Sequence, residues 1–293
     1  MIQIGIPKGF KDYELIDSGN NEKLERFGRY VLCRPEPQAV WSRSLSPQEW
    51  RRLADARFEQ AGSSSGTWER INPDMPDAWN VAYSHREMRI RFRLTLTRFK
   101  HVGIFPEQAW NWDFIYDQCK AVPTPKVLNL FAYTGGASLA ARAAGADVIH
   151  CDSIRQVVNW ANRNMELSKL NDIRWLVEDA FKFVKREAGR GRTYHGIVLD
   201  PPAWGHGPKG EKWKLEDQID ELIGYVAAIL DSEQSFLVFN AYSLGFSAVI
   251  LENLVRSHLP KAMTRKLEIG ELCLRERSGR RLPAGVFARL VRK

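Results

Sequence analysis

Residues 127–138 read VLNLFAYTGGAS, a short apolar run followed by two adjacent glycines and then an alanine-rich segment. The apolar run predicts a buried strand and the alanine-rich segment predicts a helix, so Gly135 and Gly136 fall at a strand-to-helix turn. Glycine lets a ligand approach the backbone N–H groups at a helix N-terminus. We therefore expect a ligand to bind at this turn; the alternative is a tight turn in which glycine serves packing alone.

Apolar strands alternate with amphipathic helices from Lys126 onward. The pattern predicts strands at 127–130, 148–150, 174–177, 196–199 and 236–239, and helices near 136–144, 153–168, 180–188, 215–230 and 246–258. Such alternation is typical of a parallel sheet with right-handed crossovers. Two further strands, 266–274 and 285–291, predict a C-terminal antiparallel hairpin. The turn lacks the Gly-x-Gly-x-x-Gly spacing of dinucleotide folds, which disfavours hydride transfer with a nicotinamide cofactor.

The first 100 residues follow a different pattern of short strands and turns. Apolar and polar residues alternate over 88–97, which predicts a half-buried strand with Arg89, Arg91 and Arg93 on its wet face. Those arginines either contact nucleic acid or form a plain solvated face. We expect a small β-rich domain over 1–100.

Composition and charge exclude several classes of protein. The chain has 293 residues, of which 44% are hydrophobic and 27% charged, so it is globular. It lacks a bilayer-length apolar run and a signal-peptide pattern, which makes the cytosol the default. Its four cysteines lie far apart, which argues against a disulfide framework and a zinc site, and we expect no metal.

The positive charge is concentrated near the C-terminus. The net charge is +8, and residues 261–293 hold ten Lys or Arg against three Glu. A local basic surface suits a polyanionic partner, because phosphate neutralisation releases counterions. A solvated, arginine-rich hairpin is the alternative.

Acidic residues follow the second and third predicted strands. Asp152 ends the second, where a carboxylate can accept hydrogen bonds from both ribose hydroxyls of a nucleoside cofactor. Asp179 follows the third and could accept from an adenine amino group, or could cap the next helix. Together with the glycine turn, the two acids indicate an adenosine across the sheet edge.

The most specific motif follows the fourth predicted strand and reads DPPAWG at 200–205. Two prolines hold a loop rigid and remove two N–H donors, which leaves acceptors for an amino group. Asp200 and the Pro201 carbonyl can hold a nucleobase amine while Trp204 stacks on the base. Alternatively, the prolines only end the strand and Trp204 packs in the core.

The chain from about residue 85 resembles a known family. Residues 129–136, the Asp200–Pro202 motif and the segment 102–108 look like S-adenosylmethionine-dependent methyltransferases related to the bacterial large-subunit rRNA cytosine-C5 and guanine-N7 enzymes. The resemblance implies a Rossmann-like class I methyltransferase domain over 126–293, preceded by a connecting helix and cofactor-closing segment at 101–125. It implies S-adenosylmethionine as the cofactor. The implied cofactor-binding residues are Phe105, Gln108, Asn129, Phe131, Tyr133, Thr134, Gly135, Gly136, Ala137, Asp152, Ser153, Asp179 and Ala180.

The chain departs from these relatives at two places. Tyr242 stands where the cytosine-C5 members carry a nucleophilic cysteine after the fifth strand, and neither Cys151 nor Cys273 is obviously placed to replace it. Attack on a pyrimidine ring needs a thiolate, so covalent chemistry is disfavoured. The additional RNA-binding domain of some relatives is not apparent in residues 1–80, which resemble a small cap that could recognise substrate.

These features predict methyl transfer to a base nitrogen in RNA, with rRNA favoured. Direct displacement at the sulfonium methyl would rely on Asp200, Pro201 and Trp204. Lys209 and Lys212, in a glycine-rich loop that could form a mobile lid, and Tyr242 are candidate substrate contacts. We expect an RNA partner, no membrane contact, and a monomer or homodimer. A methyltransferase for a small molecule or protein, and a non-catalytic RNA-binding module, remain alternatives.

Overall fold

The computed structural model describes residues 1–62, 65–243 and 245–292. The chain forms two compact units that interleave along the sequence. The first contains residues 1–5, 110–272 and the chain from Gly285 onward, and the second contains residues 6–109 and 273–284. The sequence predicts consecutive domains with boundaries at residues 100 and 125. In the structure, each unit instead combines segments that are far apart along the chain.

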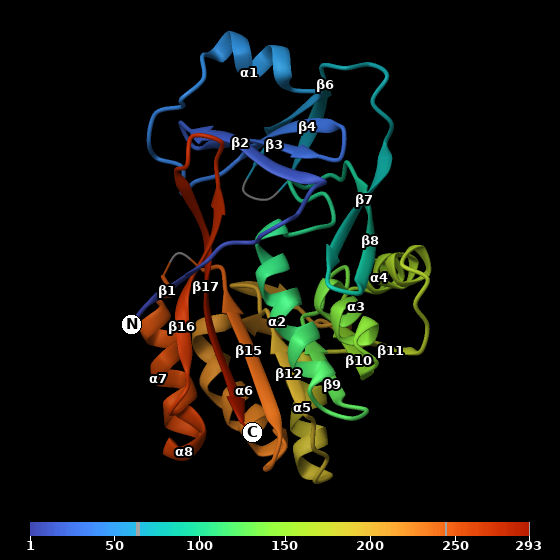
Figure 1. Ribbon diagram of the computed structural model, residues 1–293, viewed down its shortest axis with the longest axis vertical. Coiled ribbons are helices and arrows are strands. Elements are labelled where there is room, and N and C mark those ends of the chain that lie inside the picture. The colour runs from blue at the N-terminus through green and yellow to red at the C-terminus, as the bar shows by residue number, and fades with distance from the viewer. Residues whose placement is uncertain (63–64, 244, 293) are drawn as a thin grey trace. The chain divides into compact units, whose positions relative to one another are not determined.

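An eight-stranded sheet forms the centre of the first unit (Figure 1). Its spatial order is β1-β16-β17-β15-β12-β9-β10-β11. The strands are β1 (Gln3–Gly5), β9 (Lys126–Leu130), β10 (Asp147–Asp152), β11 (Ile173–Val177), β12 (Gly196–Leu199), β15 (Ser235–Ala241), β16 (Glu268–Arg275) and β17 (Arg281–Arg292). The five strands from β15 to β11 are parallel, and β17 pairs antiparallel with β15. The predicted α/β fold is confirmed, including its antiparallel C-terminal strand.

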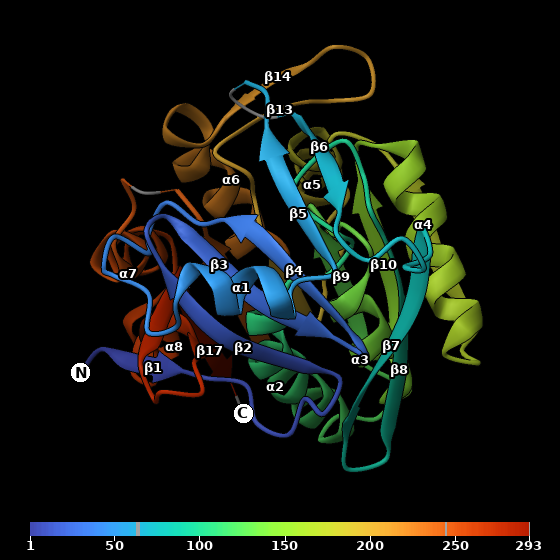
Figure 2. The ribbon, with the colours of Figure 1, turned by 90° about the horizontal axis from the view of Figure 1, so that it is seen from above.

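Helices cover both faces of this sheet (Figures 1 and 2). They are α2 (Ala109–Lys120), α3 (Gly136–Ala143), α4 (Arg155–Leu167), α5 (Ala180–Gly189), α6 (Leu215–Ile229), α7 (Ala248–His258) and α8 (Lys261–Thr264). The apolar residues of α5, α6 and α7 pack on one face, and α2, α3 and α4 lie over the other. All residues of β12 and β15 are buried, which explains why these strands are apolar without alternation.

One strand of the sheet has no counterpart among the predicted strands. Residues 3–5 pair parallel with residues 270–272, so the N-terminal segment adds an eighth strand to a sheet for which the sequence indicates seven. A Cβ at Gly270 would lie 2.1 Å from the carbonyl oxygen of Gln3. The pairing therefore depends on a glycine in β16, and a three-residue strand is too short for a periodic pattern.

The second unit is rich in β structure, as predicted. A five-stranded sheet has the order β2-β3-β4-β5-β6, and β7 pairs with β8 in a separate ribbon. The elements are β2 (Tyr13–Gly19), β3 (Glu22–Phe27), β4 (Tyr30–Pro35), α1 (Pro47–Leu53), β5 (Ala56–Gln60), β6 (Gly66–Arg70), β7 (Ala78–His85), β8 (Met88–Thr95) and the 3-10 helix Pro106–Gln108. Burial alternates along β8 and leaves Arg89, Arg91 and Arg93 exposed, which confirms the predicted half-buried strand.

No helix within the described ranges is long and apolar enough to cross a membrane.

Candidate active site

The predicted motifs converge where the strand order of the parallel sheet reverses. β9 lies between β10 and β12, and Leu130 at the end of β9 is paired with Leu199 at the end of β12. Phe131 begins the glycine turn and Asp200 begins the proline loop directly after this pair. In open α/β sheets ligands bind at such a switch point, outside the carboxyl ends of the strands. The topology therefore places both motifs at one ligand-binding edge.

The turn between β9 and α3 holds an unusual backbone conformation. Phe131, Tyr133 and Gly135 have φ values of 53°, 49° and 92°. A non-glycine residue in the left-handed region costs about 1–3 kcal/mol and persists only where the surroundings enforce it. Two such residues within three positions mark the turn as a shaped site.

Buried polar side chains brace this turn from behind. Asn129 Nδ2 donates to Ser138 Oγ at 2.9 Å, and Ser138 Oγ lies 3.0 Å from His150 Nδ1. Asn164 Nδ2 donates to the carbonyl of Thr134 at 3.0 Å. Burial lowers the pKa of His150 to about 3, so its ring is neutral. The Asn129 side chain is buried and supports the start of α3, and its place in the cofactor-binding turn stays a prediction.

Asp152 is fixed at the end of β10 by backbone amides. Its Oδ2 accepts from Tyr133 N at 2.9 Å and its Oδ1 accepts from Ile154 N at 3.0 Å. Burial raises the pKa of Asp152, although the N–H groups that it accepts from oppose this shift. The carboxylate thus joins the glycine turn to the second strand end.

Asp179 acts as a helix cap. Its Oδ1 accepts from Lys182 N at 2.8 Å and it is the N-cap residue of α5. Ala180, the first residue of α5, is buried, whereas Ser153 after Asp152 is half-buried. The prediction that Asp179 caps the next helix is confirmed. The cap uses one of the two carboxylate oxygens of Asp179.

The proline loop is held by a tryptophan that sequence reasoning missed. Trp213 Nε1 donates to the carbonyl of Pro202 at 2.7 Å, and its ring lies 5.0 Å from that of Phe131. Leu215 N donates to the carbonyl of Ala203 at 3.0 Å. None of the described residues donates to the carbonyl of Pro201, which therefore retains its acceptor capacity. The alternation of lysine and apolar residues over 212–215 is a sequence signal that could have indicated a buried Trp213.

The segment after the prolines is a small antiparallel ribbon, which corrects the expected loop. β13 (Trp204–His206) pairs with β14 (Lys212–Lys214). Trp204 is 62% exposed, so the interpretation that it packs in the core is wrong. Lys212 is exposed on β14, and Lys209 lies in the connecting turn, where its N–H donates to Glu211 Oε2 at 2.8 Å.

The other predicted residues lie at scattered positions. Tyr242 follows β15, and its ring is 3.1 Å from the point where a Cβ at Gly285 would lie. Gly136 opens α3 and Ala137 follows it, half-buried. Phe105 and Gln108 belong to the second unit. Leu244, which ends the motif compared at Tyr242, lies outside the described residues.

None of the four cysteines is exposed. Burial raises the pKa of the Cys119 thiol to about 12 and raises that of Cys151 further above its usual range. Among the described residues, no group of three or more His, Cys, Asp or Glu is placed to hold a metal ion.

The sheet order and the shaped turn define a class I methyltransferase fold. The family model of S-adenosylmethionine-dependent methyltransferases matches residues 23–220, and the chain belongs to this family. A crystal structure of the S-adenosylmethionine-dependent methyltransferase from Agrobacterium tumefaciens is 37% identical with a TM-score of 0.90, and the match covers 99% of this chain and 94% of that one. The protein is therefore an S-adenosylmethionine-dependent methyltransferase.

More distant relatives include ribosomal RNA methyltransferases. Ribosomal RNA large subunit methyltransferase K/L of Shewanella frigidimarina is 29% identical over 168 residues, 56% of this chain and 23% of that protein. Ribosomal RNA large subunit methyltransferase I of Cronobacter sakazakii is 36% identical over 84 residues, 28% of this chain and 21% of that protein. The chain thus matches less than a quarter of the length of either relative.

The residues at the switch point fit the cofactor. The turn leads into the N-terminus of α3, whose first N–H groups would face the methionine part of the cofactor. Asp152 is held in place by amides and is suited to accept from ribose hydroxyls.

Proposed function

We propose that this methyltransferase modifies a nitrogen of a base in RNA, with rRNA favoured, by direct displacement. The observation that carries the proposal is the rigid Asp200–Pro202 loop, which lies beside the glycine turn. The Pro201 carbonyl is available to accept a hydrogen bond from the substrate nitrogen, and Trp204, two residues after Pro202, is exposed. A flat aromatic side chain next to fixed acceptors suits a base that carries an amino group.

The chain's own residues orient the acceptor. S-adenosylmethionine supplies an electrophilic methyl group on sulfonium when bound. Asp200 and the Pro201 carbonyl accept hydrogen bonds from the acceptor nitrogen and aim its lone pair, while Trp204 stacks on the base. Lys209 and Lys212 contact phosphate, and Tyr242 lies against the substrate. No strong base is needed, because the nitrogen loses its proton after the methyl group has transferred.

Direct displacement is supported by the state of the thiols. All four cysteines are buried, and burial disfavours the thiolate of Cys151 at the end of the neighbouring strand β10. A covalent route needs an accessible thiolate. Tyr242 occupies the position where related cytosine-C5 enzymes would supply one.

RNA is favoured as the acceptor by the names of the relatives and by charge. Two rRNA methyltransferases match parts of the chain, and the net charge is +8. The second unit would act as a substrate-recognition cap, and Phe105 and Gln108 would close the cofactor pocket. The same proposal places the enzyme in the cytoplasm as a monomer or homodimer.

Transfer of a labelled methyl group tests the proposal. RNA from a strain that lacks the protein is fractionated, incubated with enzyme and labelled S-adenosylmethionine, and digested for nucleoside mass analysis. We expect label in one N-methylated nucleoside. Label in 5-methylcytidine would overturn direct displacement. Label in a protein or small-molecule fraction alone, with cofactor binding intact, would overturn the RNA acceptor.

The role of Asp200 is tested by Asp200→Ala, with Asp147→Ala as a matched control. Asp147 is the first residue of β10, so it lies at the amino ends of the parallel strands, away from Asp200, and it is exposed. Losing a group that orients the transition state costs about 10²–10³ in kcat. We expect that loss in Asp200→Ala with unchanged affinity for S-adenosylhomocysteine, and wild-type turnover in the control. Full transfer activity in Asp200→Ala would contradict the proposed role of Asp200 in orienting the acceptor nitrogen.

A further inference from the structure

The second unit contains a pocket that the methyl-transfer site does not use. Its volume is about 350 Å³, and α1, the segment before it, and strands β4 to β6 contribute its lining. Pockets that hold small ligands measure about 300–1,000 Å³, so this one is large enough for a single nucleotide. Its polar lining residues are Arg43, Gln48, Arg51, Arg57 and Glu69, and Trp50 supplies an aromatic wall.

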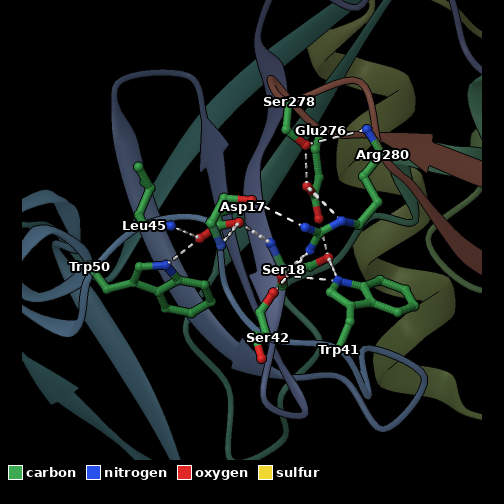
Figure 3. Close-up of polar contacts among 10 residues, drawn as sticks. Asp17, Ser18, Trp41, Ser42, Leu45, Trp50, Glu276, Ser278 and Arg280 are labelled. Carbon is green, nitrogen blue, oxygen red and sulfur yellow. Dashed lines mark hydrogen bonds and ion pairs between the residues drawn. The ribbon is translucent and has the colours of Figure 1, made fainter.

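The aromatic wall of the pocket is held rigidly. Trp50 Nε1 donates to Asp17 Oδ2 at 2.7 Å (Figure 3). Asp17 also accepts from the backbone N–H groups of Ser44 at 3.1 Å and Leu45 at 2.9 Å. The guanidinium of Arg43 lies 3.9 Å from the centre of a Trp50 ring. The tryptophan and one arginine are therefore positioned before any ligand binds, which reduces the entropy lost on binding.

The arginines outnumber the carboxylates that face them. Arg57 Nη2 donates to Glu22 Oε1 at 2.7 Å, and Arg43 Nη2 pairs with Glu22 Oε2. One carboxylate thus serves two guanidinium groups. The Arg51 side chain makes no ion pair or hydrogen bond with any described residue, and Glu69 supplies the other negative charge. Among the residues that line the pocket, three arginines stand against one glutamate, Glu69, so the lining itself carries a net positive charge.

Hydrogen-bond donors are also in excess. A guanidinium has five N–H donors, and within the described chain Glu22 and the carbonyl of Gly19 account for only part of those on Arg43 and Arg57. A ligand with several acceptor oxygens and a negative charge would satisfy both the donors and the charge. A phosphate group has this chemistry. An internal salt-bridge cluster would explain Arg43 and Arg57 but neither Arg51 nor the open volume.

We propose that this pocket binds the phosphate and sugar of one RNA nucleotide outside the methylated base, an inference that rests on the proposed function. Such a contact fixes the position of the RNA without reading its sequence. The ligand is a phosphodiester, so binding at the pocket is sensitive to salt.

The test compares charge reversal at two neighbouring arginines. Arg51→Glu alters the pocket, whereas Arg52→Glu makes the same change one residue along α1 at an exposed side chain that does not line it. The probe is a fluorescein-labelled ten-nucleotide single-stranded RNA of mixed sequence, bound to the full chain at several salt concentrations. We expect Arg51→Glu to weaken binding about tenfold and to reduce the slope of log Kd against log salt by about one. Arg52→Glu should change Kd less than about twofold, because long-range electrostatics alone are weak in salt.

Two further measurements separate the outcomes. Arg51→Gln removes the charge without reversing it and should give an intermediate loss, while S-adenosylhomocysteine affinity and thermal unfolding stay at wild-type values in all three variants. Equal losses in Arg51→Glu and Arg52→Glu would overturn the pocket and leave RNA methylation untouched. A selective loss in Arg51→Glu supports the pocket even if no RNA fraction accepts a methyl group, which would overturn the proposed function alone.

Discussion

Asp152 combines a structural role with the proposed role of binding the cofactor ribose. It accepts hydrogen bonds from Tyr133 N and Ile154 N, and these hold the glycine turn against the end of β10. The same carboxylate is the candidate ribose acceptor. Burial raises its pKa, so it takes up a proton at a higher pH than an exposed aspartate would.

This shift predicts the pH dependence of cofactor binding. Affinity for S-adenosylhomocysteine should fall as the pH is lowered through the raised pKa of Asp152, because a protonated carboxyl accepts poorly from ribose hydroxyls. Isothermal titration calorimetry across the acidic range measures this. Asp152→Asn should bind about 10- to 100-fold more weakly at neutral pH and lose the acid-dependent decline.

Protonation of Asp152 should affect the free energy of unfolding in the opposite direction to its effect on cofactor affinity. Because the folded-state pKa of this acid is raised, its contribution to the free energy of unfolding is most favourable below the unfolded-state pKa and is lost as the pH rises through the folded-state pKa. Acid therefore does not unfold the protein through Asp152. The same pH profile of binding in wild type and Asp152→Asn would contradict the assignment.

Single residues are predicted unevenly from the sequence. Asp152, Asp200 and Gly135 stand at strand ends, and their positions follow from the strand pattern. Trp213 and Asn164 act through a hydrogen bond to a carbonyl distant in sequence, Pro202 for one and Thr134 for the other. No local period reports such a contact, because tertiary packing alone brings the partners together.

At the scale of elements, the turn from β9 to α3 depends on one close contact. A Cβ at Gly136 would lie 2.6 Å from Trp112 Cε2 of α2, closer than real Cβ atoms come. The glycine therefore allows α2 and α3 to pack closely beside the turn that follows β9.

Gly136→Ala should lower the free energy of unfolding by about 1–3 kcal/mol, as overpacking does. Denaturant unfolding measures this loss. The double variant Gly136→Ala with Trp112→Phe should recover part of it, since the smaller ring leaves room for the methyl group.

Gly145→Ala is the matched control for this prediction. Gly145 follows α3 with a φ of 97°, and a Cβ added there would meet nothing within 4 Å, so alanine at this position suffers backbone strain alone. Trp112→Phe should give no rescue of Gly145→Ala. Equal rescue of both glycine variants would show that the contact with Trp112 is not the cause.

Elements with a long periodic pattern are predicted well, and short ones are not. The parallel strands and their helices match their expected ranges to within about three residues. β1, β13 and β14 have three residues each, too few to establish a period, and they form only because a partner strand is present. A glycine-rich composition at 205–210 predicts a loop where the register with β14 produces a ribbon.

At the scale of the whole molecule, the tip of the C-terminal hairpin belongs to the β-rich unit. Glu276 is buried there and pairs with Ser18 of β2 and with Ser278 (Figure 3). Arg280 donates to the carbonyls of Ser18 at 3.3 Å and Ser42 at 3.1 Å. The sequence predicts the hairpin. It does not predict that residues 273–284 belong to the β-rich unit, because that depends on contacts between distant segments.

Arg280→Ala should destabilise the β-rich unit by about 2 kcal/mol, because it removes a donor from two carbonyls and the cationic partner from the buried Glu276. Hydrogen exchange followed by mass spectrometry should show faster exchange in β2 and β3 and unchanged exchange in β9 and β10. Arg281→Ala, at the exposed neighbouring residue, is the control. Faster exchange throughout both units would contradict a local role for the tip.

The interleaved chain has a consequence for synthesis on the ribosome. Leu15 and Ala39 of the β-rich unit pack with Leu274 and Leu282, which are translated after the 163 residues from Trp110 to Leu272. At about 5–20 residues per second, that delay is roughly 8–33 s. During it, the nascent β-rich segment exposes apolar surface that only residues 273–284 can cover. The β-rich unit is thus completed only after residues 273–284 have been made, and its folding in the cell should depend on chaperones that hold the growing chain.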